Sequence, residues 1–184
     1  MKKRTWLVMS SLVLLVYLLV PGPFDISDFG YLPNSDKSID PGDTVQIPNI
    51  TAYYSFNNRD LVTKFFRQDY HRLTMLPFSP IRLNYPPEYA YQTVKDQTQS
   101  TFLEEYIYPL RDSLYVNGFE PYYDDGTAKF PRAAQFGING KHYNNKDTLR
   151  FYPSTILSRV IVWLGINLGV LGLYRVGRRV LIGG

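Results

Sequence analysis

The stretch TILSRVIVWLGINLGVLGLY, from Thr155 to Tyr174, decides the architecture of this chain. A helix of about 20 predominantly apolar residues crosses the roughly 30 Å hydrocarbon core of a bilayer. Arg159 lies in the first turns, where we expect its long side chain to reach the headgroup region. We therefore predict that residues 154–175 form a C-terminal transmembrane helix.

Three glycines are expected on one face of this helix. Gly165, Gly169 and Gly172 are spaced by four and three residues, and small residues at such spacing let another helix approach closely. We interpret them as a helix-packing surface. Its partner is the first apolar segment, a second copy of the chain or another membrane protein. The alternative is that glycine is simply common in membrane helices.

A second apolar run, WLVMSSLVLLVYLLV, extends from Trp6 to Val20. At 1.5 Å per residue it is about 22 Å long, shorter than the hydrocarbon core. The following residues, Val20-Pro21-Gly22-Pro23, lack the small-residue cleavage site of a secretory signal peptide. We interpret residues 1–24 as an uncleaved transmembrane signal anchor, with a cleaved signal as the alternative.

The charges are arranged around these two segments. The net charge is +4, but thirteen basic and all sixteen acidic residues lie between positions 25 and 150, so this part is acidic. Such a distribution argues against a nucleic-acid-binding surface. Basic residues flank the apolar segments on their outer sides, as cytoplasmic flanks do: Lys2, Lys3, Arg4, Arg175, Arg178 and Arg179.

The charge pattern predicts a topology. Both termini, including a basic tail at 176–184, are expected in the cytoplasm, and the central domain on the other side of the cytoplasmic membrane. The inner membrane of an organelle is the alternative location. This topology predicts the lipid bilayer as a partner. A further partner would be another membrane protein, or a second copy of the chain, bound through the second helix.

The central part is predicted to be an α+β domain. Residues 25–48 are rich in Pro, Asp, Ser and Gly and predict an extended spacer before a domain at 49–153. A helix over 59–76 has an apolar stripe and an opposite face carrying Lys64, Arg67, Gln68 and His71. We expect a second short helix over 88–97, after Pro87.

The second half of this domain has strand-like sequence. Asn117-Gly118 predicts the turn of one hairpin and residues 138–141 that of another, before a final strand over 149–152. The expected fold class is α+β, with one or two helices and small antiparallel hairpins between two transmembrane helices. The chain has no cysteine, so disulfides and cysteine-ligand zinc sites are excluded.

Tyrosine is unusually abundant, with sixteen residues in 184. Tyr106 and Tyr108 are two residues apart and would share one face of a strand. We interpret them as an aromatic strip that contacts a partner, the membrane interface or a glycan. The alternative is that they pack in the core and pair across strands.

Catalytic and metal-binding motifs are absent from the sequence. There is no Gly-x-Ser-x-Gly, His-Glu-x-x-His or phosphate-binding loop, and His71 and His142 are far apart. We therefore predict no catalytic residue, no metal site and no cofactor. The remaining hydrolase alternative is a carboxylate pair that combines Glu104 or Glu105 with Asp124 or Asp125.

The stretch from Asp96 to Gly118, DQTQSTFLEEYIYPLRDSLYVNG, carries a resemblance together with residues 149–154. It is similar to a group of small bacterial two-span membrane proteins, from which no activity, cofactor or site residue can be carried over. We expect a membrane-anchored structural or interaction protein of the cell envelope that is not an enzyme. The alternatives are an envelope glycan- or lipid-binding module and a membrane-tethered hydrolase.

Overall fold

The computed structural model describes residues 2–44, 46–94, 99–123, 125–131, 133, 135–138 and 140–182, and only the backbone of residues 2–4, 181 and 182. The chain forms two compact units, Gly22–Pro153 and a helical unit made of Met1–Pro21 with Ser154–Gly184. The first is an α+β unit with an antiparallel sheet, as predicted.

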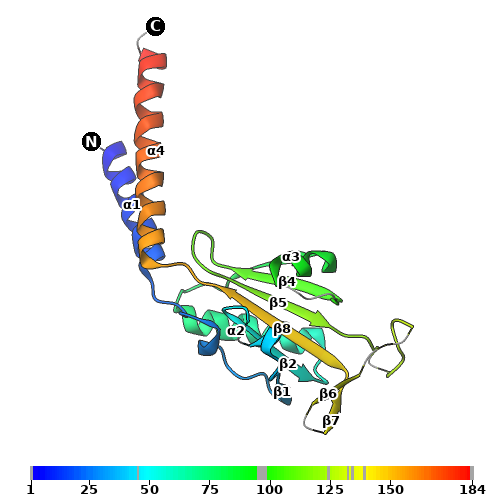
Figure 1. Cartoon of the computed structure of the whole chain (residues 1–184). Coiled ribbons are helices and arrows are strands. Elements are labelled where there is room, and N and C mark those ends of the chain that lie inside the picture. The colour runs from blue at the N-terminus through cyan, green and yellow to red at the C-terminus, as the bar shows by residue number, and fades with distance from the viewer. Residues whose placement is uncertain are drawn as a thin grey trace. The chain divides into compact units, whose positions relative to one another are not determined.

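The larger unit, here called the sheet unit, is built on a six-stranded antiparallel sheet (Figure 1). The strand order is β1-β2-β8-β5-β4-β3. The strands are β1 (Ser35–Lys37), β2 (Ile50–Ser55), β3 (Ile81–Tyr85), β4 (Phe102–Ile107), β5 (Ser113–Phe119) and β8 (Asn145–Tyr152). A separate hairpin of β6 (Phe136–Ile138) and β7 (Lys141–Tyr143) lies at the turn predicted over 138–141.

Helix α2 (Arg59–Thr74) covers one face of the sheet. Asn58 caps it by accepting a hydrogen bond from the Leu61 backbone N–H, as such N-terminal residues do. Phe66 and Tyr70 are completely buried, and the Phe66 ring packs 5.9 Å from that of Tyr53 on β2. The apolar stripe predicted for this helix therefore forms the core.

The opposite face of the sheet is covered by a shorter element. A 3-10 turn, Pro87–Tyr89, leads into the four-residue helix α3 (Ala90–Thr93). Ala90 and Val94 pack on Ile50 and Leu103. The helix predicted over 88–97 is therefore confirmed only in part, because residues 95–98 lie outside the described residues.

The predicted turn at Asn117-Gly118 is wrong. Both residues lie inside β5, and the chain reverses before this strand instead, with Leu110 at φ 63°. Gly118 is required by packing rather than by a turn, since a Cβ there would lie 2.0 Å from Phe102 Cε1. The local Asn-Gly signal was overridden by cross-strand packing.

The predicted spacer at 25–48 also needs correction. Leu32 is fully buried, Phe29 stacks edge-on against Phe151 of β8 at 5.2 Å, and β1 joins the sheet through β2. Two apolar side chains within a Pro- and Asp-rich sequence are enough to anchor this segment on the sheet unit.

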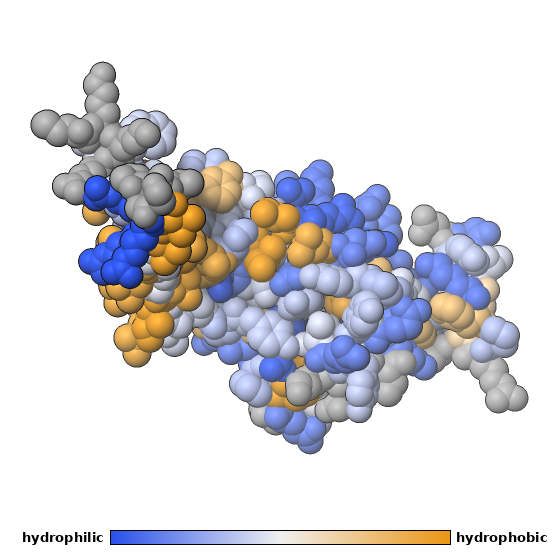
Figure 2. All heavy atoms as spheres, turned by 90° about the horizontal axis from the view of Figure 1, so that it is seen from above, coloured by the Kyte–Doolittle hydropathy of each residue, from blue (hydrophilic) through white to orange (hydrophobic). Residues whose placement is uncertain are grey.

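The helical unit consists of α1 (Lys2–Leu19) and α4 (Ile156–Ile182). Among the described residues, only α4 contains a helix long and apolar enough to cross a membrane, Ile156–Val180, whereas the apolar part of α1, Thr5–Leu19, is shorter. Helix α4 also continues through the predicted tail as far as Ile182. Figure 2 shows the hydrophobic residues of this unit as a largely orange surface.

Candidate functional site

Arg159 is the main polar contact between the two helices of the helical unit. Its Nη1 donates hydrogen bonds to the backbone oxygens of Leu18 (3.2 Å) and Val20 (3.4 Å), and its Nε to Ser154 Oγ (2.7 Å). The last carbonyls of a helix have no intrahelical donor and attract a cation. The guanidinium of Arg159 therefore caps α1, and the headgroup contact that we predicted for it stays a prediction.

A second contact fixes the direction of the pair. The indole Nε1 of Trp163 donates to the backbone oxygen of Ser11 (2.9 Å). Because Ser11 precedes Leu18 in α1 while Trp163 follows Arg159 in α4, the two helices run antiparallel, and both chain ends point the same way within this unit (Figure 1).

The predicted glycine face lies on α4 but is open. Outside the backbone of α4 itself, no described atom is within 4 Å of where a Cβ would lie on Gly165, Gly169 or Gly172. Helix α1, one of the three partners that we considered for the glycines, therefore packs on another face of α4. The basic residues at 2–4 and at 175, 178 and 179 lie at the ends of α1 and α4 that carry the termini.

Tyr106 and Tyr108 do not form an exposed strip. Their exposed fractions are 1% and 0%, and the ring of Tyr108 packs edge-on against that of Tyr70 at 5.1 Å. The Tyr106 hydroxyl donates to Glu104 Oε2 (2.6 Å), and that of Tyr108 to the backbone oxygen of Phe78 (3.1 Å). The contact-strip interpretation is wrong for these two residues, because both rings serve the core.

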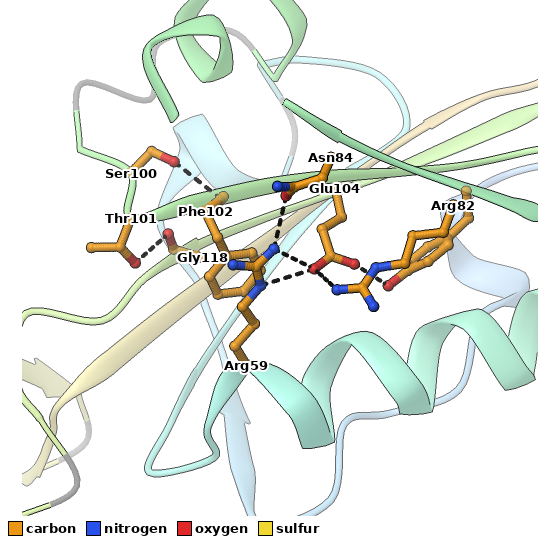
Figure 3. A network of polar contacts seen from close by, with 9 residues as sticks. Arg59, Arg82, Asn84, Ser100, Thr101, Phe102, Glu104 and Gly118 are labelled. Carbon is orange, nitrogen blue, oxygen red and sulfur yellow. Dashed lines mark hydrogen bonds and ion pairs between the residues drawn. The ribbon is translucent and has the colours of Figure 1, made fainter. Parts of the chain in front are cut away.

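Glu104 is a buried carboxylate held by two arginines (Figure 3). Its Oε1 accepts hydrogen bonds from Arg59 Nε (2.8 Å), Arg59 Nη2 (2.7 Å) and Arg82 Nη2 (2.5 Å). Burial alone would raise the pKa of Glu104, but the hydrogen bonds from Arg82, Tyr106 and Arg59 lower it overall. Glu104 is therefore ionised, and two cations share its single charge.

A groove lies beside this network, between α2 and the edge strand β3. We call it the α2–β3 groove; its volume is about 670 Å³. Most of its lining comes from the polar face of α2, which the sequence predicts, and β3 supplies the opposite wall. The lining residues are Asp60, Thr63, Lys64, Arg67, Gln68, His71, Ser79, Arg82 and Tyr106.

A smaller pocket of about 280 Å³ lies at another place on the sheet unit. We call it the Tyr123 pocket; it combines aromatic rings, amides and one ion pair. The lining residues are Phe56, Asn58, Glu120, Tyr122, Tyr123, Gly126, Lys129, Asn144 and Asn145. Lys129 Nζ lies 3.6 Å from Glu120 Oε2 and 5.4 Å from the centre of the Tyr123 ring.

Burial affects the acidic groups near this pocket. It raises the pKa of Glu120, whose Oε1 is buried without a hydrogen-bond partner among the described residues. Behind it lies Asp147 of β8, completely buried, with neither carboxylate oxygen hydrogen-bonded to a described residue. Burial, and secondarily the charge of Glu120, raises the pKa of Asp147 well above its usual range. No local sequence pattern indicates this pair of buried carboxyl groups.

Two of the carboxylates predicted for the hydrolase alternative lie on opposite faces of one strand, β4. Glu104 faces α2, whereas Glu105 lies on the other face of β4 and accepts a hydrogen bond from the Tyr85 hydroxyl (2.7 Å), which raises the pKa of Tyr85 to about 12. Asp125 is in an exposed turn, and Asp124 lies outside the described residues. Within the described ranges, no three acidic or histidine side chains are grouped so that they could hold a metal ion.

Comparisons of the chain with family models, with curated proteins and with solved structures found no match in any of the three. The functional proposals below therefore rest on the geometry of the chain itself.

Proposed function

We propose that this protein is a membrane-anchored interaction protein that presents the sheet unit outside the cytoplasmic membrane, with no enzymatic activity of its own. The observation that carries the proposal is α4, whose apolar span Ile156–Val180 has only 6% of its most apolar window buried. An exposed apolar helix of this length is stable in a bilayer and not in water. The inner membrane of an organelle is the alternative location.

We further propose that α1 is a second span, which makes the chain a membrane hairpin with both termini in the cytoplasm. Its apolar part, Thr5–Leu19, corresponds to about 22 Å of helix, a length that a bilayer with a core of roughly 30 Å accommodates by local thinning and by snorkelling of the flanking basic residues. Support comes from the antiparallel pairing with α4 and from Arg159, which satisfies carbonyls at the end of α1. The basic residues at the outer ends of both helices favour the same orientation.

Single-cysteine labelling tests this topology. Because the chain has no cysteine, one introduced thiol is the only reactive site. In intact cells, a membrane-impermeant maleimide should label Tyr91→Cys, in the sheet unit, and should label Val180→Cys only after permeabilisation. Leu168→Cys is the control, since it is as exposed as Val180 but should be shielded by lipid in both conditions.

Two outcomes would contradict the topology. Labelling of Tyr91→Cys and Val180→Cys from the same side would exclude a single passage of α4 between them. For α1, the intact mass of the purified protein should be that of the whole chain, 21.3 kDa. A smaller mass that corresponds to the loss of α1 would identify it as a cleaved signal peptide.

A second candidate function, glycan binding, is favoured by the Tyr123 pocket. Aromatic rings stack on sugar rings, while amide and carboxyl groups bind their hydroxyls. The pocket offers Phe56 and Tyr123 as largely exposed rings beside Asn58, Asn144 and Glu120.

Binding of N-acetylglucosamine oligosaccharides to the full chain in detergent micelles tests this second function. Tyr123→Ala should weaken binding at least about tenfold, because it removes a stacking ring. Tyr91→Ala removes an equally exposed tyrosine outside the pocket and should leave the affinity unchanged. Equal affinities for the two variants, or no binding by the unchanged protein, would reject the glycan hypothesis.

A further inference from the structure

Cations gather in the α2–β3 groove although the chain between residues 25 and 150 is acidic overall. Lys64 and Arg67 project from α2, and Arg82 comes from β3 on the opposite wall. Among the described residues of the lining, Asp60 is the only acidic one, and it is exposed in the first turn of α2. The lining therefore carries three positive charges against one negative charge.

The nearest buried carboxylate does not remove this excess. Glu104 forms ion pairs with both Arg59 (2.7 Å) and Arg82 (2.5 Å), so two cations share one anion (Figure 3). The hydrogen bond from its Nη2 to Glu104 holds the Arg82 guanidinium in place. The side chain of Arg82 stays 46% exposed, so its other N–H groups can reach a ligand.

Arg67 is only weakly satisfied by the chain itself. Its Nε is buried and has no hydrogen-bond acceptor among the described residues, while its Nη2 makes only a long contact of 3.4 Å to the Pro80 backbone oxygen. Buried donors are normally satisfied in folded proteins. Arg67 also lines the groove, and an anion there would be the natural partner of the part of its guanidinium that faces the groove.

We propose that the α2–β3 groove binds a molecule that carries a phosphate group. Lys64, Arg67 and Arg82 would hold the charge, and Thr63 and Ser79 place hydroxyl donors in the same lining. A phosphate monoester is close to dianionic at neutral pH and has several acceptor oxygens, which matches the excess charge and the number of donors. At about 670 Å³ the groove has room for a larger molecule than inorganic phosphate.

Calorimetric titration of the full chain in nonionic detergent with glycerol 3-phosphate tests this assignment. We expect saturable binding that the double variant Lys64→Gln/Arg67→Gln weakens at least about tenfold. The matched control is Lys37→Gln/Lys141→Gln, which removes the same charge from exposed residues on β1 and β7. It should keep the affinity within about twofold.

The source of the phosphate group is determined by competition. If the groove binds lipid headgroups, mixed micelles that contain phosphatidylglycerol should displace glycerol 3-phosphate. If it binds soluble phosphate esters, these micelles should not displace it. Both results support the groove as the binding site. Lys64→Gln alone, an exposed substitution, gives the same comparison if the double variant does not fold. Absence of binding, or equal weakening by both double variants, would overturn the proposal without bearing on the membrane topology or the Tyr123 pocket.

Discussion

Replacement of Gly118 by alanine should destabilise the sheet unit by about 3 kcal/mol. The new Cβ would lie 2.0 Å from Cε1 and 2.2 Å from Cζ of Phe102 on the neighbouring strand. The Phe102 ring is buried, and the Arg59 guanidinium lies over it at 4.9 Å, so the ring has no free direction in which to move (Figure 3). Urea unfolding of the full chain in detergent micelles measures the loss.

Gly137→Ala is the matched control for this prediction. Gly137 is also in a strand, but a Cβ there would meet its nearest atom, His142 Nδ1, at an ordinary distance of 3.7 Å. Its stability should stay within about 0.5 kcal/mol of the unchanged protein. In addition, Phe102→Leu should partly rescue Gly118→Ala, as expected for two residues in contact. A Gly118→Ala variant as stable as the control would show that the strand tolerates the extra methyl group.

Asp147 predicts a pH dependence of stability. Its raised pKa means that the folded chain keeps a proton that the unfolded chain has already lost, since an unfolded aspartate titrates near 3.9. The free energy of unfolding should therefore fall as the pH rises above the pKa of the unfolded aspartate. The fall is up to about 1.4 kcal/mol per pH unit and ends once the pKa of the folded state is passed. Asp147→Asn should be more stable than the unchanged protein at neutral pH and should lose most of this slope.

Unfolding experiments at pH 5 and pH 8 would measure the effect. Asp125→Asn is the control, because it removes the same formal charge from an exposed turn where hydrogen bonds from Thr127 lower the pKa of Asp125. A lowered pKa puts its titration below this pH range, so the control should keep the slope of the unchanged protein. If Asp147→Asn also keeps this slope of stability against pH, the buried carboxyl of Asp147 is not the group that causes it.

The sequence predicted those elements whose signal is local. The apolar repeat of Val62, Phe66 and Tyr70 predicted α2, which ends at Thr74 where Met75 takes a left-handed conformation. The sequence also predicted the hairpin turn over 138–141 and the final strand. Strands β1, β2 and β3 were missed. The edge strand β3 is mostly exposed and the interior strand β2 is buried at every residue, so neither shows an alternation to recognise, and the edge strand β1 is only three residues long.

The candidate sites were only half predictable for the same reason. The cationic face of α2 could be placed from helical periodicity, but its opposite wall on β3 could not. The ion pair between Arg59 and Glu104 joins residues 45 positions apart, and it depends on a strand register that no local pattern specifies. The buried Asp147 was unpredictable because a charged residue in a strand normally indicates an exposed face.

The central place of β8 has a consequence for the biosynthesis of this protein. Strand β8 is the last to be synthesised, yet it lies between β2 and β5 and pairs with both. Before it emerges, β1–β2 and β3–β4–β5 are two separate groups of strands with no ladder between them. Only three residues separate β8 from α4, so the sheet can close only once the synthesis of α4 is under way. The order of synthesis thus delays folding of the sheet unit until nearly its whole length has been made.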